Sequence, residues 1–147
     1  MKISENLKAR FGGKVDIFEK SKKRIYVTVA KPDAKDIIGY LFKDLGARMS
    51  IATGIDTRPA IEILYHMTLD KYDMIITIRI FVRKPELEMP TVTNIIPGAL
   101  WIEREIHEML GVDFTGHPNL ERLLLPDDWE EGVYPFRKNS FESESEN

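Results

Sequence analysis

The residues best suited to chemistry lie between positions 103 and 117 of the chain. Glu103 and His107 are four positions apart, so on a helix they would share a face, as two metal ligands might. His117 follows in a turn, Gly116-His117-Pro118, in which the proline restricts the backbone of His117 to extended geometry. These side chains support the hypothesis of a free-standing, metal-dependent enzyme that uses Glu103, His107 and His117.

The same residues also have an ordinary structural interpretation. Arg104 and Glu108 share a helix face and can pair, which is typical of a solvated face with ion pairs. His107-Glu108 begins like the zinc-protease motif H-E-x-x-H, but the second histidine position is Gly111, so the motif fails. For His117, a hydrogen bond to a nearby backbone carbonyl is the simpler interpretation. The residues alone leave these alternatives open.

Composition narrows the class of protein. The chain has 147 residues, 43% hydrophobic and 31% charged, with a net charge of -3, which indicates one soluble domain and argues against nucleic acid as the main partner. It has no cysteine, which excludes disulfides, Fe–S ligation and thiol catalysis by its own residues. High charge without cysteine is also typical of thermophilic proteins. Phosphate-loop and dinucleotide-binding motifs are absent from the sequence.

No segment of the sequence predicts direct membrane insertion. The first residues show no apolar run behind a basic segment, so we expect no signal peptide. The longest apolar stretch, residues 95–102, is interrupted by Pro97 and is too short to span a bilayer. Any membrane association is therefore expected to go through a partner.

Hydrophobic periodicity predicts the fold class. Helical spacing of apolar residues indicates helices over 3–11, 33–45 and 98–110, with Asp33 as the cap of the second helix. Alternation indicates strands over 15–18, 25–29, 48–55, 61–69 and 74–82. This order predicts an α+β, two-layer sandwich with helix, two strands, helix and three strands in a mixed sheet, helices on one face, then a helix and an extended C-terminal arm.

We expect three regions along the chain. Residues 1–90 form the α+β core domain, with a charged linker over 84–89 at its end. Residues 91–139 hold an irregular segment, the last helix and an extended interaction arm, and residues 140–147 form a disordered acidic tail. Trp129, Tyr134 and Arg137 in the arm are of the types that dominate protein–protein contacts, which also leaves a general peptide-binding module as a weaker possibility.

One stretch of this chain resembles a known family. The matching residues are Trp101-Ile102-Glu103-Arg104-Glu105, Gly111-Val112, Phe114, Gly116-His117-Pro118, Leu120, Arg122, the leucines with Pro126, Trp129, Tyr134-Pro135 and Arg137-Lys138. Together they resemble the signature of the C subunit of respiratory complex I (NADH dehydrogenase), a family that includes the equivalent protein of archaeal membrane-bound hydrogenase-type complexes. His107, Glu108 and Leu110 depart from the commoner pattern and are more similar to the hydrogenase-type branch.

The resemblance implies a cofactor-free, non-catalytic subunit of the hydrophilic arm of a membrane-bound oxidoreductase. It implies docking on the hydrogenase-large-like subunit, near Fe–S cluster subunits and indirectly antiporter-like membrane subunits, peripheral on the cytoplasmic side of the membrane. Fe–S clusters, and Ni–Fe in hydrogenase-type members, would belong to those partners. The expected subunit interface comprises Trp101, Glu103, Arg104, Glu105, Gly111, Phe114, Gly116, His117, Pro118, Arg122, Leu124, Leu125, Trp129, Tyr134, Pro135, Arg137 and Lys138.

Overall fold

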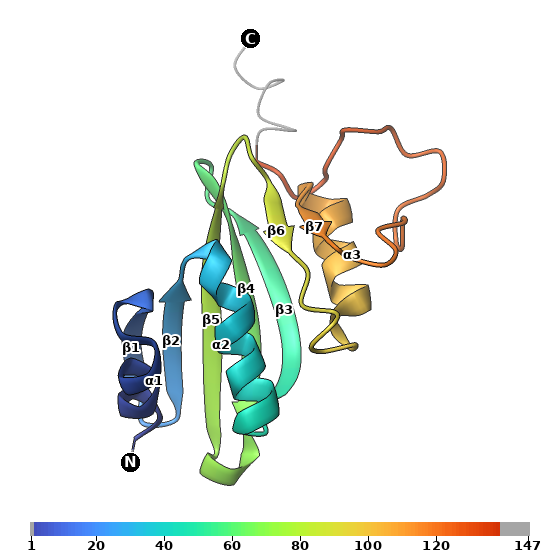
Figure 1. Cartoon of the computed structure of the whole chain (residues 1–147). Helices are drawn as coiled ribbons and strands as arrows, with labels where there is room; N and C mark the ends of the chain where they lie inside the picture. The colour runs from blue at the N-terminus through green and yellow to red at the C-terminus, as the bar shows by residue number, and fades with distance from the viewer. Residues whose placement is uncertain (1, 139–147) are drawn as a thin grey trace.

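A computed structural model describes residues 2–138, with three α-helices and seven strands in that range (Figure 1). In chain order the elements are α1 (Ile3–Phe11), β1 (Val15–Ser21), β2 (Arg24–Val29), α2 (Ala34–Gly39), β3 (Arg48–Asp56), β4 (Ala60–Leu69), β5 (Met74–Arg83), β6 (Glu88–Pro90), α3 (Ala99–Leu110) and β7 (Asp113–Thr115). The predicted α+β class and the predicted order of helices and strands are confirmed.

The main sheet is mixed, in the order β1-β2-β5-β4-β3, with β2 and β5 parallel and the other neighbours antiparallel. The alternation in β4 sends Ile61, Ile63, Tyr65 and Met67 to the helix-covered face, where each is fully buried. In Figure 1, α1 and α2 lie across this face of the sheet. Tyr65 also reaches Glu103 on α3, so α3 covers the same face along β3. The two-layer sandwich is therefore confirmed.

The second helix is less regular than its apolar spacing predicts. It runs as an α-helix over Ala34–Gly39 and continues as a wider π-helical turn over Tyr40–Asp44, in which the Leu45 N–H donates to the carbonyl of Tyr40. The predicted capping role of Asp33 is wrong. Its side chain makes no capping hydrogen bond, because a short 3-10 turn over Lys31–Asp33 starts the helix instead.

The predicted linker and irregular chain contain a small second sheet. Strand β6 pairs in parallel with β7, so that Met89 lies opposite Phe114 and both side chains are buried. The sequence predicts only a charged linker over 84–89 and an extended arm here, because strands of three residues are too short for alternation to be recognised, and Pro90 argues against a strand in sequence terms. This pairing fixes the start of the arm beside the core.

The predicted tail, residues 140–147, lies outside the described residues. The division at residue 90 remains a prediction, although α3 packs directly on β3. No helix within residues 2–138 is long and apolar enough to cross a membrane.

Candidate functional site

The predicted C-terminal arm is a loop that starts at the C-terminus of α3 and folds back to contact the same end of α3. The chain departs from the C-terminus of α3 at Gly111 and comes back at Phe136, whose N–H donates to the Met109 carbonyl over 3.0 Å. The side chain of Arg137 donates from Nε to the Leu110 carbonyl over 2.6 Å. We call residues 111–138 the closed loop; Figure 1 shows it as the orange-to-red excursion beside α3. Two consecutive residues thus satisfy carbonyls that a helix end leaves without partners.

Gly111 allows the two ends of this loop to meet. Its φ is +79°, and a Cβ there would lie 2.5 Å from Nη2 of Arg137 and 2.7 Å from Cε2 of Tyr134. The guanidinium of Arg137 lies over the Tyr134 ring, 4.6 Å from its centroid. A side chain at position 111 would therefore displace the contacts that close the loop.

Glu108 organises the middle of the closed loop. Its carboxylate accepts the backbone N–H groups of Leu123, Leu124 and Leu125 over 3.0, 2.9 and 2.9 Å. Burial pushes the pKa of Glu108 upward, but the three N–H donors and the nearby Arg122 outweigh it, so the pKa lies below its usual value. A carboxylate held in this way is a structural anchor for the leucine segment.

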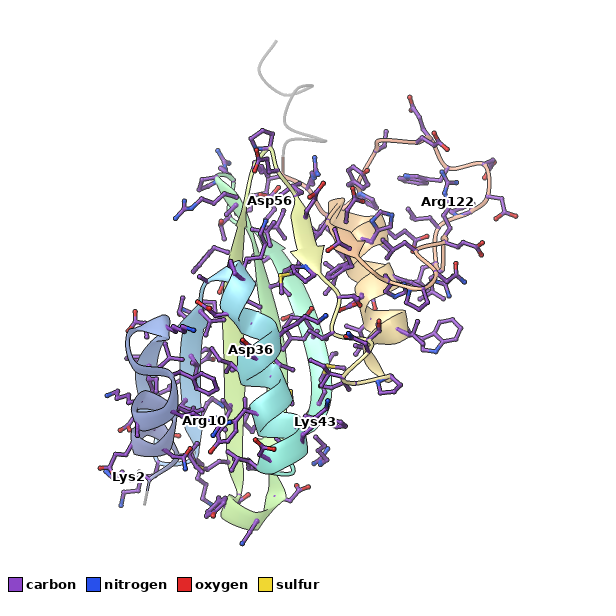
Figure 2. All side chains as sticks on the ribbon, viewed as in Figure 1. Lys2, Arg10, Asp36, Lys43, Asp56 and Arg122 are labelled. Atoms are coloured by element: carbon purple, nitrogen blue, oxygen red, sulfur yellow. The ribbon has the colours of Figure 1, made fainter. Side chains whose placement is uncertain are left out.

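Two arginines satisfy backbone carbonyls of the same loop. Arg104 donates to the carbonyls of Glu121 and Arg122 over 2.9 and 2.8 Å. Arg122, labelled inside the loop in Figure 2, donates to the carbonyls of Pro126, Asp127 and Trp129. Because guanidinium groups present several donors in a fixed plane, each arginine fixes a turn that has no regular secondary structure.

A buried polar cluster ties the start of the loop to the core. Glu103 has no exposed surface and accepts from the Val92 N–H over 2.9 Å and from the Thr91 hydroxyl. Burial raises the pKa of Glu103 despite these donors, and it raises the pKa of neighbouring Tyr65 well above its usual value. His117 lies 4.0 Å from Glu103, with Nε2 donating to the Leu100 carbonyl and Nδ1 accepting from the Asn119 N–H.

These contacts do not assemble the metal site of the enzyme hypothesis. His107 is engaged separately, because its Nδ1 donates to the Val112 carbonyl over 2.8 Å and lies 3.3 Å from Asp113. Within residues 2–138, no group of three or more His, Cys, Asp or Glu side chains is placed to hold a metal ion. The simpler interpretation of His117, a hydrogen bond to a backbone carbonyl, is confirmed.

The far end of the closed loop is held by Asp56, a residue that no sequence pattern indicated. It lies at the end of β3 and accepts from Nζ of Lys84 over 2.9 and 3.0 Å and from the Lys138 N–H over 3.0 Å. Although burial opposes ionisation, these donors and the Arg58 N–H hold the pKa of Asp56 below its usual value. Figure 2 shows Asp56 at the end of the sheet. Lys84 and Lys138 lie 28 and 82 positions away from Asp56, a separation at which no local sequence pattern indicates the contact.

The expected interface residues differ in how far they are exposed: some are exposed, some are half-buried and others are buried. Trp101 and Leu124 expose 61% and 60% of their surface, and the unpredicted Phe136 exposes 62%. Glu105, Gly116, Pro118 and Lys138 are also exposed. Glu103 and Phe114 are buried in the isolated chain. They can therefore support the expected interface surface, but they are not part of it. The side chain of His117 also has no exposed surface. The half-buried members are Arg104, Gly111, Arg122, Leu125, Trp129, Tyr134, Pro135 and Arg137.

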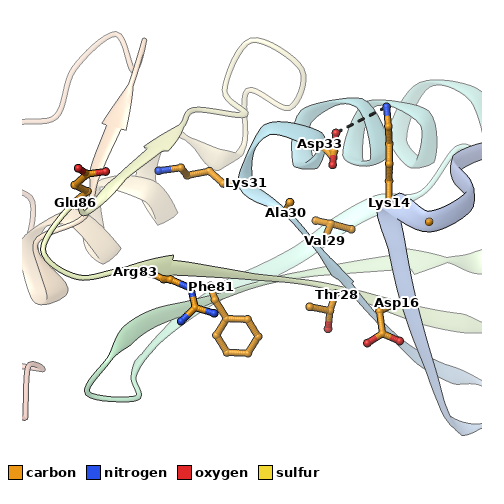
Figure 3. Close-up of a pocket in the computed structure, with 11 residues that line it drawn as sticks. Lys14, Asp16, Thr28, Val29, Ala30, Lys31, Asp33, Phe81, Arg83 and Glu86 are labelled. Carbon is orange, nitrogen blue, oxygen red and sulfur yellow. Dashed lines mark ion pairs between the residues drawn. The ribbon is translucent and has the colours of Figure 1, made fainter.

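A cavity of about 670 Å³ is lined by residues of β1, β2 and β5 and of the segments next to these strands. Figure 3 shows Lys31 and Arg83 among its lining residues, and the ion pair in which Nζ of Lys14 lies 3.9 Å from Oδ1 of Asp33. Its lining mixes acidic and basic groups, which favours no single ligand charge. None of the expected interface residues lines this cavity.

The fold and the site together define a small α+β sandwich that carries a pre-shaped surface loop. The chain belongs to the family described as respiratory-chain NADH dehydrogenase, 30 Kd subunit, whose profile matches residues 27–146. This confirms the resemblance to the C subunit of complex I.

Among curated relatives, the chain is 33% identical over 126 residues to "Formate hydrogenlyase subunit 5" of Escherichia coli (strain K12), covering 83% of this chain and 22% of that protein. It is 32% identical over 148 residues to the C/D subunit of NADH-quinone oxidoreductase from Acinetobacter baylyi, covering 92% and 24%. The chain therefore spans less than a quarter of the length of these relatives.

Two solved structures share the fold. A chain of the membrane-bound sulfane sulfur reductase, described as an archaeal respiratory membrane complex, superposes with a TM-score of 0.84 at 24% identity, covering 93% of this chain and 82% of that one. A trypsin-resistant fragment of Nqo5 superposes with a TM-score of 0.69 at 20% identity, covering 82% and 100%.

Proposed function

We propose that this chain is a non-catalytic structural subunit in the hydrophilic arm of a membrane-bound oxidoreductase related to complex I. The specific type that we favour is an archaeal membrane-bound hydrogenase or a related ferredoxin-dependent complex. The observation that carries the proposal is the closed loop, because its own polar groups are used to fix its shape while Trp101, Leu124 and Phe136 remain on the surface.

A loop fixed in this way is suited to binding a protein. Ordering a flexible segment on association costs affinity, and a segment that is already ordered avoids that cost. An exposed Trp, here Trp101, together with half-buried Trp, Tyr and Arg side chains provides the residue types that dominate the binding energy of protein interfaces. We propose that the exposed members of the expected interface touch the partner, and that Glu103, Glu108 and Arg122 act by holding the loop in shape.

The curated relatives favour a particular kind of partner. Two of them are named as C/D subunits of NADH-quinone oxidoreductase, and this chain matches only 14% and 24% of their lengths. In those proteins the matching segment is therefore joined to a much longer stretch of chain. We propose that this chain docks on a separate protein of that kind, the hydrogenase-large-like subunit, and that partner subunits hold the Fe–S clusters and, in a hydrogenase-type complex, the Ni–Fe centre.

This arrangement would place the chain at the cytoplasmic side of the membrane through its partners. The Fe–S cluster subunits and the antiporter-like membrane subunits would be neighbours within the complex, the latter reached only indirectly. This part of the proposal rests on family membership.

Native co-purification tests the proposal. The tagged chain is isolated from membranes of its own source, and the proteins that accompany it are identified by mass spectrometry. The proposal predicts a hydrogenase-large-like protein, Fe–S proteins and antiporter-like membrane proteins in the eluate. Leu124→Ser should reduce their recovery, whereas Tyr72→Ser, an exposed position in the turn between β4 and β5, should not. Recovery of the wild-type chain alone would overturn the proposal.

A further inference from the structure

The closed loop and α3 form the walls of an open cavity of about 470 Å³ that the proposed docking role does not by itself explain. His107 and Glu108 of α3 line one side of it. Trp129, Glu130, Glu131 and Tyr134 of the closed loop are among the residues that line the other. The cavity is open to the outside of the molecule, so a group from another molecule can reach it.

The lining carries an excess of negative charge. Among the lining residues that the structure describes, Arg122 is the one arginine or lysine, and its guanidinium is committed to three backbone carbonyls. Glu108 is likewise committed to three N–H groups. Glu121, Glu130 and Glu131 add three further carboxylates on exposed residues. The cavity therefore attracts a cation more than an anion or a neutral group.

The aromatic residues in the lining narrow the choice of cation. Trp129 and Tyr134 are half-buried and are the aromatic residues in the lining. Guanidinium groups already pack on aromatic rings in this part of the molecule, with Arg137 4.6 Å from the Tyr134 ring and Arg104 5.1 Å from the Trp101 ring. A guanidinium can stack on a ring and donate to carboxylates in the same plane, which a compact ammonium ion cannot do.

We propose that this cavity receives an arginine side chain from the partner polypeptide. The inference rests on the proposed docking function and names the chemistry of the partner segment that enters the loop. The partner's guanidinium would be held by Glu130 and Glu131 beside Trp129, as a charge-assisted contact.

The test uses the complex isolated from native membranes through the tagged chain. The double variant Glu130→Gln/Glu131→Gln removes two charges and keeps the size of each side chain. We expect its partner proteins to leave the immobilised chain about ten times faster than those of the wild type, which corresponds to a loss of about 1.4 kcal/mol. Circular dichroism of the isolated variant should match the wild type, because both residues are exposed.

The matched control is Asp127→Asn/Asp128→Asn, which removes two charges from the same loop outside the cavity lining. The inference predicts a release rate close to that of the wild type for this control. Equal acceleration by both double variants would show a general charge effect, and no acceleration by either would show an unused cavity; each result overturns the inference. If the wild-type chain recovers no partner at all, it is the docking proposal that fails.

Discussion

At the scale of single residues, Arg104, Glu108 and Arg122 all form hydrogen bonds with the backbone of their own chain. The sequence suggested a helix face with ion pairs between Arg104 and Glu108. In the structure Arg104 donates to carbonyls and Glu108 accepts from N–H groups of the loop. Glu103 and Glu108 lie on one helix, yet their pKa values shift in opposite directions, because burial dominates at Glu103 and hydrogen bonding dominates at Glu108.

Glu108→Gln should destabilise the chain by about 1–3 kcal/mol at neutral pH, because one amide oxygen replaces a carboxylate that accepts three N–H groups. Since the folded-state pKa of Glu108 is lowered, its stabilisation is present above the usual value of 4.5 and is lost as the pH falls through the folded value. Urea unfolding at pH 7 and at acid pH checks both points. A variant that is equally destabilised at both would contradict this account.

Glu103→Gln should change the pH dependence of stability in the direction opposite to that of Glu108→Gln. The folded-state pKa of Glu103 is raised, so its contribution is fully present below the usual value of 4.5 and declines as the pH rises through the folded value. A neutral glutamine can still accept from the Val92 N–H and removes this decline. The stability of the wild type relative to the variant should therefore fall between acid and neutral pH. Glu103→Ala, which leaves that N–H without its acceptor, should cost about 1–3 kcal/mol beyond any packing loss.

At the scale of elements, the regular core could be predicted from the sequence and the loop closures could not. Periodicity located α1, β2, β4, β5 and α3, since each buries one face against a single layer. The pairing of β6 with β7 and the return of Arg137 to Leu110 depend on contacts between residues more than twenty positions apart. No local pattern encodes such contacts, so the sequence predicts only an extended arm.

Gly111→Ala should open the closed loop. The new Cβ would meet Arg137 and Tyr134 at 2.5 and 2.7 Å, and overpacking of this kind costs about 1–3 kcal/mol. Gly132→Ala is the matched control, because Gly132 has a similar φ of +80° with nothing within 4 Å of the added Cβ. Chemical denaturation should show a larger loss for Gly111→Ala, and the variant loop should be cut faster by trypsin. Equal losses would mean that backbone strain alone matters.

At the scale of the whole molecule, Asp56 joins three parts of the chain at one end of the sheet. It links the end of β3 to Lys84 after β5 and to Lys138 at the end of the closed loop.

Asp56→Asn should lower the free energy of unfolding by about 2–3 kcal/mol. This is less than the 3–5 kcal/mol lost when a wholly buried ion pair is broken, because the side chain of Lys84 is 19% exposed. Thermal unfolding from pH 7 to pH 3 checks this. The wild type should lose its advantage as the pH falls below the usual aspartate value of 3.8, since the folded-state pKa is lowered.

The central claim, that the closed loop is the docking surface toward a partner in the complex, is tested most directly by the reactivity of single cysteines. The chain has no cysteine, so Leu124→Cys and Tyr72→Cys each introduce one thiol at an exposed position. In the isolated chain both thiols should react with a maleimide at similar rates. In the complex purified from native membranes, we predict that Leu124→Cys is protected while Tyr72→Cys still reacts. Full reactivity of Leu124→Cys in the intact complex would contradict the claim.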